Sequence, residues 1–179
     1  MKRIIMLCAL VGLTLACAFG QEIKIKSKGA LHAEGEGQAK ALVVTGTMKI
    51  KVKGVFAIAP ANIKVTIQGK SAEKTPIKNS KTGKVSGYLY KDVDGIVTVT
   101  GEKYLATVQG AGIKIDAEGA GKIFLIGSGK YTATDSPKDK ERSGSWLPRP
   151  TPETKTSPAP IEFGVVEINL PEKKGDAKK

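Results

Sequence analysis

The sequence predicts an all-β protein built from short strands. Apolar and charged residues alternate in several runs, most clearly in MKIKVKG at 48–54, where lysine occupies every second position. Glycine ends most of these runs, which are rich in Ile, Val, Thr and Tyr. No window repeats its apolar residues at the 3.6-residue interval of a helix. Alternation with a period of two places the apolar residues on one face of a strand and the charges on the other, so we expect half-buried strands.

Two runs, ALVV at 41–44 and IFLI at 123–126, are apolar at every position. We expect each to form a strand that is covered on both faces. Each run follows a similar stretch, AEGEG beginning at Ala33 and AEGAG beginning at Ala117. This correspondence predicts two related halves, 22–69 and 85–133.

Short strands separated by glycines fit two β architectures. The first is an antiparallel meander or sandwich, and the second is a β-solenoid in which short strands stack as rungs. Glycine-x-glycine corners and a low aromatic content favour the solenoid, whereas Asp94-Gly95 is a hairpin signal that favours the meander. We expect a solenoid-like stack, with the antiparallel arrangement as the alternative. The pattern of short runs separated by glycines in the β region resembles exported adhesin-type β-solenoids and, more distantly, bactofilins, although a strict repeat is missing.

The N-terminal segment 1–20 predicts an export signal. Two basic residues precede an apolar stretch that is too short to span a bilayer comfortably, and Ala18 and Gly20 are the small residues that a signal peptidase reads. We expect cleavage after Gly20, no transmembrane segment in the mature chain, and a periplasmic or extracellular location.

Cys17 offers an alternative form of processing, because a cysteine at the end of an apolar leader can carry a lipid anchor. Lipoprotein signals usually have leucine three positions earlier, where this chain has Thr14. Lipid anchoring at Cys17 therefore stays the alternative. Cleavage after Gly20 would remove both Cys8 and Cys17, leaving no disulfide framework, cysteine nucleophile or thiolate metal site.

The mature chain predicts one β domain followed by a proline-rich segment. We expect the domain at 21–133, interrupted by an exposed polar loop at 70–84. The region 134–160 is rich in proline and poor in apolar residues, which predicts an extended linker. The run 161–170 is strand-like again and should return to pair with the domain, followed by a disordered lysine-rich tail at 171–179.

The chain is strongly basic, with 29 Lys and Arg against 17 Asp and Glu and a formal net charge of +12. Such a surface attracts anionic polymers. Nucleic acid is the weakest candidate among them, because arginine forks and stacking aromatic residues are missing from the β domain. Lysine on a strand is also a common solubilising residue that discourages edge-to-edge aggregation. The candidate polyanion contacts are Lys24, Lys26, Lys49, Lys51 and Lys53.

Signals for catalysis and for metal binding are weak. His32 is the single histidine, and it should be an ordinary solvated side chain on the same face as Glu34. KDVDG at 91–95 resembles the opening of a calcium loop, but the later acidic ligands are missing. Carboxylates for a hydrolase could come from the two AEG regions, namely Glu34, Glu36, Asp116 and Glu118, yet the domain lacks a tryptophan platform for a sugar. No phosphate-binding loop is present.

The sequence therefore predicts an exported, non-enzymatic protein of the cell envelope or extracellular space, with a structural or interaction role and no cofactor. The alternative is a weak binder of anionic envelope polymers through the lysine-rich strand faces. A carboxylate-based hydrolase is the third hypothesis. The expected partners are anionic envelope polymers or another envelope protein, and the sequence predicts no oligomeric state.

Overall fold

The computed structural model describes residues 22–70, 73–148 and 159–169. These residues form β-strands and no helix, which confirms the all-β prediction. The predicted export signal at 1–20 and the predicted tail at 171–179 lie outside the described residues. The strands are β1 (Glu22–Ser27), β2 (Gly29–Ala59), β3 (Lys64–Lys70), β4 (Glu73–Lys78), β5 (Val85–Thr134), β6 (Arg142–Ser145), β7 (Ile161–Phe163) and β8 (Val165–Asn169).

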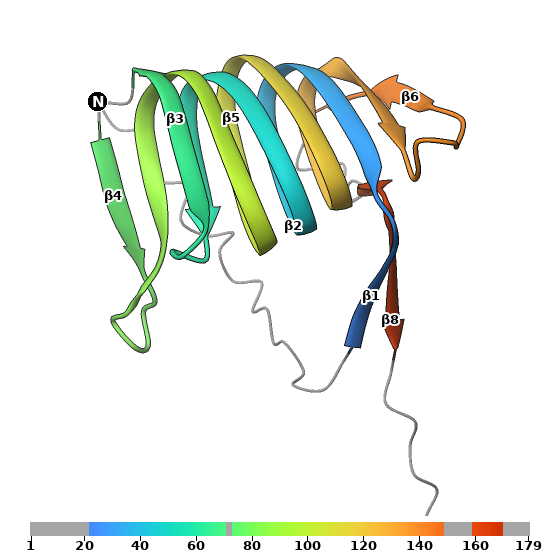
Figure 1. The fold of residues 1–179 in the computed structure, drawn as a ribbon. Coiled ribbons are helices and arrows are strands. Elements are labelled where there is room, and N and C mark those ends of the chain that lie inside the picture. Colours follow the sequence, from blue (N-terminus) through green and yellow to red (C-terminus); the bar gives the residue numbers. More distant parts are fainter. Residues whose placement is uncertain (1–21, 71–72, 149–158, 170–179) are drawn as a thin grey trace, which may run out of the picture. The chain divides into compact units, whose positions relative to one another are not determined.

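β2 and β5 are long strands that pair with each other antiparallel along both edges of β2. Leu42 of β2 pairs with Leu105 on one side and with Lys122 on the other. These two partners lie 17 positions apart in β5, at 105 and 122, so successive segments of β5 flank each segment of β2. Figure 1 shows this as ribbons of β2 and β5 that alternate across the sheet.

The shorter strands extend this sheet at its margins. β3, β4, β6 and β7 each pair antiparallel with β5. β1 and β8 pair with each other in a separate two-stranded sheet. Residues 25–167 form one compact unit, and the outer ends of β1 and β8 belong to a second unit.

The alternation read from the sequence at 48–53 determines which side chains enter the core. Met48, Ile50 and Val52 are each 1% exposed, whereas the lysines between them are exposed. Buried apolar side chains from β2 and β5 belong to a single cluster, which Trp146 and Phe163 complete. Full burial of an aliphatic side chain of this size stabilises the fold by about 1.5–3 kcal/mol, so this inward face is the main source of stability.

The alternation changes phase along β5, and the backbone shows where. Val97 and Val99 are buried at odd positions, but Tyr104 and Ala106 are buried at even positions. Lys103 lies between the two sets with a positive φ of 52°. β2 changes phase at the matching point, from buried Val43 to buried Met48, so the pairing stays in register on both sides of Lys103.

Glycines lie where β2 and β5 approach backbone to backbone. Gly46 pairs with Gly101 on one side and Gly119 on the other, and it has a φ of +142°. A Cβ atom at Gly46 would overlap the carbonyl oxygen of Glu118. Only glycine accepts both this conformation and this approach, so the glycines bend the strands and do not end them. The structure therefore has long bent strands where the sequence predicted many short ones.

The apolar runs at 41–44 and 123–126 are covered on one face only by the core. Ala41 and Val43 are buried, but Leu42 and its neighbour Val44 are half-buried on the outer side. The second run behaves in the same way, with Ile123 and Leu125 buried and Phe124 and Ile126 half-buried. The prediction that both faces would be covered is therefore confirmed for the inner face and wrong for the outer face.

Two turn predictions differ from the structure. Asp94-Gly95 is not a hairpin turn, because both residues lie inside β5, where Gly95 pairs with Gly69 of β3. The segment 70–84, expected as an exposed loop, contains β4, and its hairpin to β5 is closed by a hydrogen bond from the backbone N–H of Asn79 to the carbonyl oxygen of Lys84. The Asp-Gly segment continues as a strand because it has partner strands on both sides. Among the described residues β4 pairs with β5 alone, and such an edge position tolerates its Pro76.

The expected linker at 134–160 is partly built into the fold. Its residues 142–145 form β6, which pairs with the end of β5. Trp146 is 4% exposed, and its indole lies against the bare backbones of Gly35 and Gly129. The indole N–H donates to the carbonyl oxygen of Lys130 at 3.2 Å. Tryptophan here fills space left by two glycines, which a reading of local composition could not reveal.

The predictions for the C-terminal part of the chain concern both described residues and residues outside the description. The strand expected at 161–170 is present as β7, which pairs with residues 121–123 of β5, and as β8. Residues 149–158 lie outside the described residues. The segments 22–69 and 85–133 pair with each other through β2 and β5, so their descent from a common repeat stays a prediction.

The glycine bends predict a specific cost of substitution. Gly46→Ala should lower the free energy of unfolding by about 2–4 kcal/mol, because the new Cβ meets a backbone carbonyl at a positive φ. Gly83→Ala is the matched control, since Gly83 also has a positive φ but has open space around its Cβ position; it should cost about 1 kcal/mol. Urea denaturation measures both. Equal costs would contradict the close approach of the strands.

Candidate functional site: the charged face

Charged side chains gather on the outer side of the segments that flank residues 47–53. The cross-strand register places exposed residues of β2, β3 and β5 in common rows on this side. We call this surface the charged face. Its charged members are His32, Glu34, Glu36, Lys49, Lys51, Lys53, Lys64, Lys70, Asp94, Lys114, Asp116, Glu118 and Lys130.

Positive and negative charges are interleaved within these rows. His32 pairs with Asp116, whose partner on the other side is Lys49. In the next row Glu34 lies beside Lys114. Opposite charges directly across a strand pair stabilise it by about 0.2–1 kcal/mol. The acidic residues therefore lie within the lysine rows and not apart from them.

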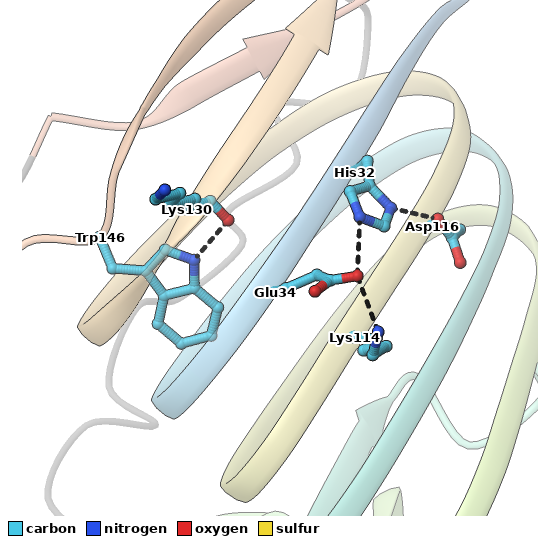
Figure 2. Close-up of polar contacts among 6 residues, drawn as sticks. All are labelled: His32, Glu34, Lys114, Asp116, Lys130 and Trp146. Carbon is cyan, nitrogen blue, oxygen red and sulfur yellow. Dashed lines mark hydrogen bonds and ion pairs between the residues drawn. The ribbon is translucent and has the colours of Figure 1, made fainter.

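Four of these side chains form a connected network, which Figure 2 shows. The imidazole Nδ1 of His32 lies 2.6 Å from Oδ1 of Asp116, and its Nε2 lies 3.2 Å from Oε1 of Glu34. The same Glu34 oxygen accepts a hydrogen bond from the ammonium of Lys114 at 2.9 Å. The network joins the start of β2 to residues 114–116 of β5, which are distant in the sequence.

The network changes the proton affinity of its members. The hydrogen bond to Asp116 raises the pKa of His32 above its ordinary value, and the charges of Asp116 and Glu34 act in the same direction, against a smaller effect of burial. The hydrogen bond from Lys114 lowers the pKa of Glu34. The imidazolium form of His32 is thus favoured between two carboxylates. All four side chains are about half exposed, so each interaction contributes little energy.

This arrangement suits cross-strand linkage better than catalysis or metal binding. Both nitrogens of His32 face carboxylate oxygens, so neither is free to remove a proton from a substrate. Among the described residues, no group of three or more His, Cys, Asp or Glu side chains is placed to hold a metal ion. The sequence placed His32 and Glu34 on one face, but it did not reveal Asp116 and Lys114 as their partners.

The five candidate polyanion contacts are divided between two sheets. Lys49, Lys51 and Lys53 lie together and exposed on the charged face. In the part of the chain that the structure describes, these three form no ion pair. Lys24 and Lys26 lie on β1 in the two-stranded sheet, where Lys26 is 3.1 Å from a carboxylate oxygen of Glu167.

A shallow open depression of about 480 Å³ borders His32. Asp116, Glu118 and Glu141 contribute carboxylates to it, and Lys49 lies at its side. Its lining contains no phenylalanine, tyrosine or tryptophan. Of the four carboxylates considered for hydrolysis, Asp116 and Glu118 meet here, while Glu34 is bound to Lys114 and Glu36 borders a separate shallow surface.

Comparisons with protein-family models, with curated proteins and with solved structures gave no match to this chain. In the described residues, no helix is long and apolar enough to cross a membrane. The function is therefore inferred from the residues and their geometry.

The His32 network predicts a pH-dependent contribution to stability. Because the pKa of His32 is raised in the folded protein, its contribution is complete below the unfolded value of 6.5 and is lost as the pH rises through the folded pKa. His32→Gln should thus lower the free energy of unfolding by about 0.5 kcal/mol at acidic pH and by less at pH 8.5.

Urea denaturation at pH 5.5 and pH 8.5 measures this difference. Lys51→Gln is the control, because Lys51 lies on the same face outside the network and should show no such pH dependence. A His32→Gln deficit that is larger at pH 8.5 would contradict the assignment.

Proposed function

We propose that this chain is an exported, non-enzymatic protein of the cell envelope or extracellular space with a structural or interaction role. The observation that carries the proposal is the network in which His32, Asp116, Glu34 and Lys114 are bound to one another across strands. Side chains with catalytic potential are used there to connect β2 with β5. The basic, apolar leader at 1–20 supports export, and lipid anchoring at Cys17 is the alternative form of processing.

We also propose that the β2–β5 ribbon is wound in a solenoid-like stack. Partners on the two sides of β2 recur 16 to 18 positions apart, as Leu105 and Lys122 do about Leu42. Glycine pairs occur at the bends of each turn. In this proposal each of the related halves, 22–69 and 85–133, supplies one long strand of the pair, β2 and β5.

Binding of anionic envelope polymers is the second candidate function. It is favoured by Lys49, Lys51 and Lys53, which are exposed at every second position of one strand segment and have no ion-pair partner among the described residues. The interleaved carboxylates weaken the electrostatic potential of this row, since Asp116 and Asp94 lie across from two of the lysines. Binding of this kind would be weak and sensitive to salt.

A carboxylate-based hydrolase is the third candidate. Asp116 and Glu118 share the depression beside His32, which is the arrangement that this reading requires. Against it, Asp116 already accepts a hydrogen bond from His32, and the lining has no phenylalanine, tyrosine or tryptophan to stack on a sugar.

A matched pair of triple variants separates the structural role from polymer binding. Replacing Lys49, Lys51 and Lys53 by glutamine removes three charges from the charged face, whereas replacing the exposed lysines of the β4–β5 hairpin, Lys78, Lys81 and Lys84, removes three charges elsewhere. For a structural role we expect both variants to lose the same small part of their retention on immobilised heparin. Each surface substitution should change stability by about 0.5 kcal/mol or less.

A larger loss for the charged-face variant would contradict this expectation and identify a polymer-binding surface. Such binding must also fade as salt rises to physiological ionic strength, where the Debye length is about 8 Å. Retention that survives high salt would contradict both electrostatic interpretations.

A further inference from the structure

The segments on the other side of the glycine bends carry a second outer surface, on which large apolar side chains lie among polar ones. Leu42 pairs directly with Leu105, and Ala57 of the following β2 segment pairs with Leu89. We call this surface the apolar face. Its large apolar members are Leu42, Val55, Leu89, Leu105, Phe124 and Ile126, all half-buried. The cross-strand register places the polar residues Gln38, Lys40, Thr107, Gln109 and Lys122 beside them.

The apolar face differs from the charged face in the number of large apolar side chains at its outward positions. Outward positions of the charged face carry lysine, threonine and acids, and Ile96 is the large apolar side chain there, at 39% exposure. Strands that are apolar on both sides are usually buried on both sides. Apolar area left in water forgoes about 25 cal/mol per Å² of stabilisation, so this face gains free energy from any apolar cover. Among the described residues, the other strands that contact β2 and β5 lie beside them in the sheet and do not lie over the apolar face.

The size of the apolar face fits a second copy of the chain. Five to six strand segments spaced about 4.8 Å apart, each about seven residues long at about 3.4 Å per residue, give a face of roughly 600–700 Å². Two such faces in contact would bury roughly 1,300 Å² in total, which lies within the range of about 1,200–2,000 Å² for specific interfaces. Sheet-on-sheet packing is the usual way to bury an apolar sheet face.

The charges around the apolar face also favour a second copy over an anionic lipid surface. Lys122 is 2.7 Å from a carboxylate oxygen of Glu162, and Lys91 is 3.3 Å from one of Glu73. These lysines are neutralised within the chain, so two copies can approach without strong repulsion. Lys40 remains as a half-buried lysine next to Phe124. Its charge would oppose a dimer and would help binding to anionic lipid.

We propose that two copies of this chain associate face to face through the apolar face, as an isologous dimer. The dimer goes beyond the proposed function, because it requires neither export nor polymer binding and uses a different surface. Its failure would leave the role of the charged face unaffected.

Sedimentation equilibrium of the chain 21–179 tests the proposal. We expect a dimer with a dissociation constant in the micromolar range, as is common for interfaces of modest size. Leu105→Glu should weaken the dimer at least tenfold, because it would bury a carboxylate at the interface. Ile96→Glu is the matched control, since it places the same charge on the charged face and should leave the dimer unchanged. Lys40→Met should strengthen the dimer.

Thermal unfolding confirms that each variant is folded, and flotation with vesicles of phosphatidylcholine and phosphatidylglycerol tests the lipid alternative. A parent chain that stays monomeric at 100 µM would overturn the proposal. So would a dimer that Leu105→Glu leaves intact. A monomeric parent that floats with the vesicles, and loses this property on Lys40→Met, would assign the apolar face to a lipid surface instead.

Discussion

The two-sided pairing of β2 with β5 is the constraint on which the rest of the structure depends. Every segment of β2 has one segment of β5 on each side, so two backbones must pass close to each other wherever the strands bend. A side chain at such a bend would meet a carbonyl oxygen of the neighbouring strand, as Gly46 shows with Glu118. Glycine at these positions lets the hydrogen-bonded pairing continue through the bend, and it determines which residues lie on each stretch between bends.

The same bends separate two surfaces with different chemistry. Along one set of segments the outward positions carry interleaved lysines and carboxylates, linked by the contacts of His32 with Asp116 and Glu34. Along the other set leucine and phenylalanine, as at Leu105 and Phe124, lie among polar residues such as Gln38 and Lys40. Both sets direct their remaining side chains into one common core. The paired strands β2 and β5 therefore present one charged outer surface and one richer in large apolar side chains.

The sequence was informative where the cause is local and uninformative where it is not. Alternation at 48–53 correctly identified buried Ile50 and exposed lysines, because period two is a property of a single strand. The phase change at Lys103 has no local signal, since an ordinary lysine adopts a positive φ there. The packing of Trp146 against two glycines and the pairing of His32 with Asp116 depend on register between distant segments. Composition alone predicted that Trp146 lies in a linker and that His32 is a lone surface histidine.

Proton–proton contacts in solution test the central claim most directly. Two-sided antiparallel pairing places Ile50 beside Val97 on one side and Ile115 on the other. Backbone nuclear Overhauser effects should therefore connect Ile50 with both of these residues, with the pattern of antiparallel neighbours. Contacts to only one of them, or contacts between Ile50 and Ile67 as stacked parallel rungs, would contradict the account.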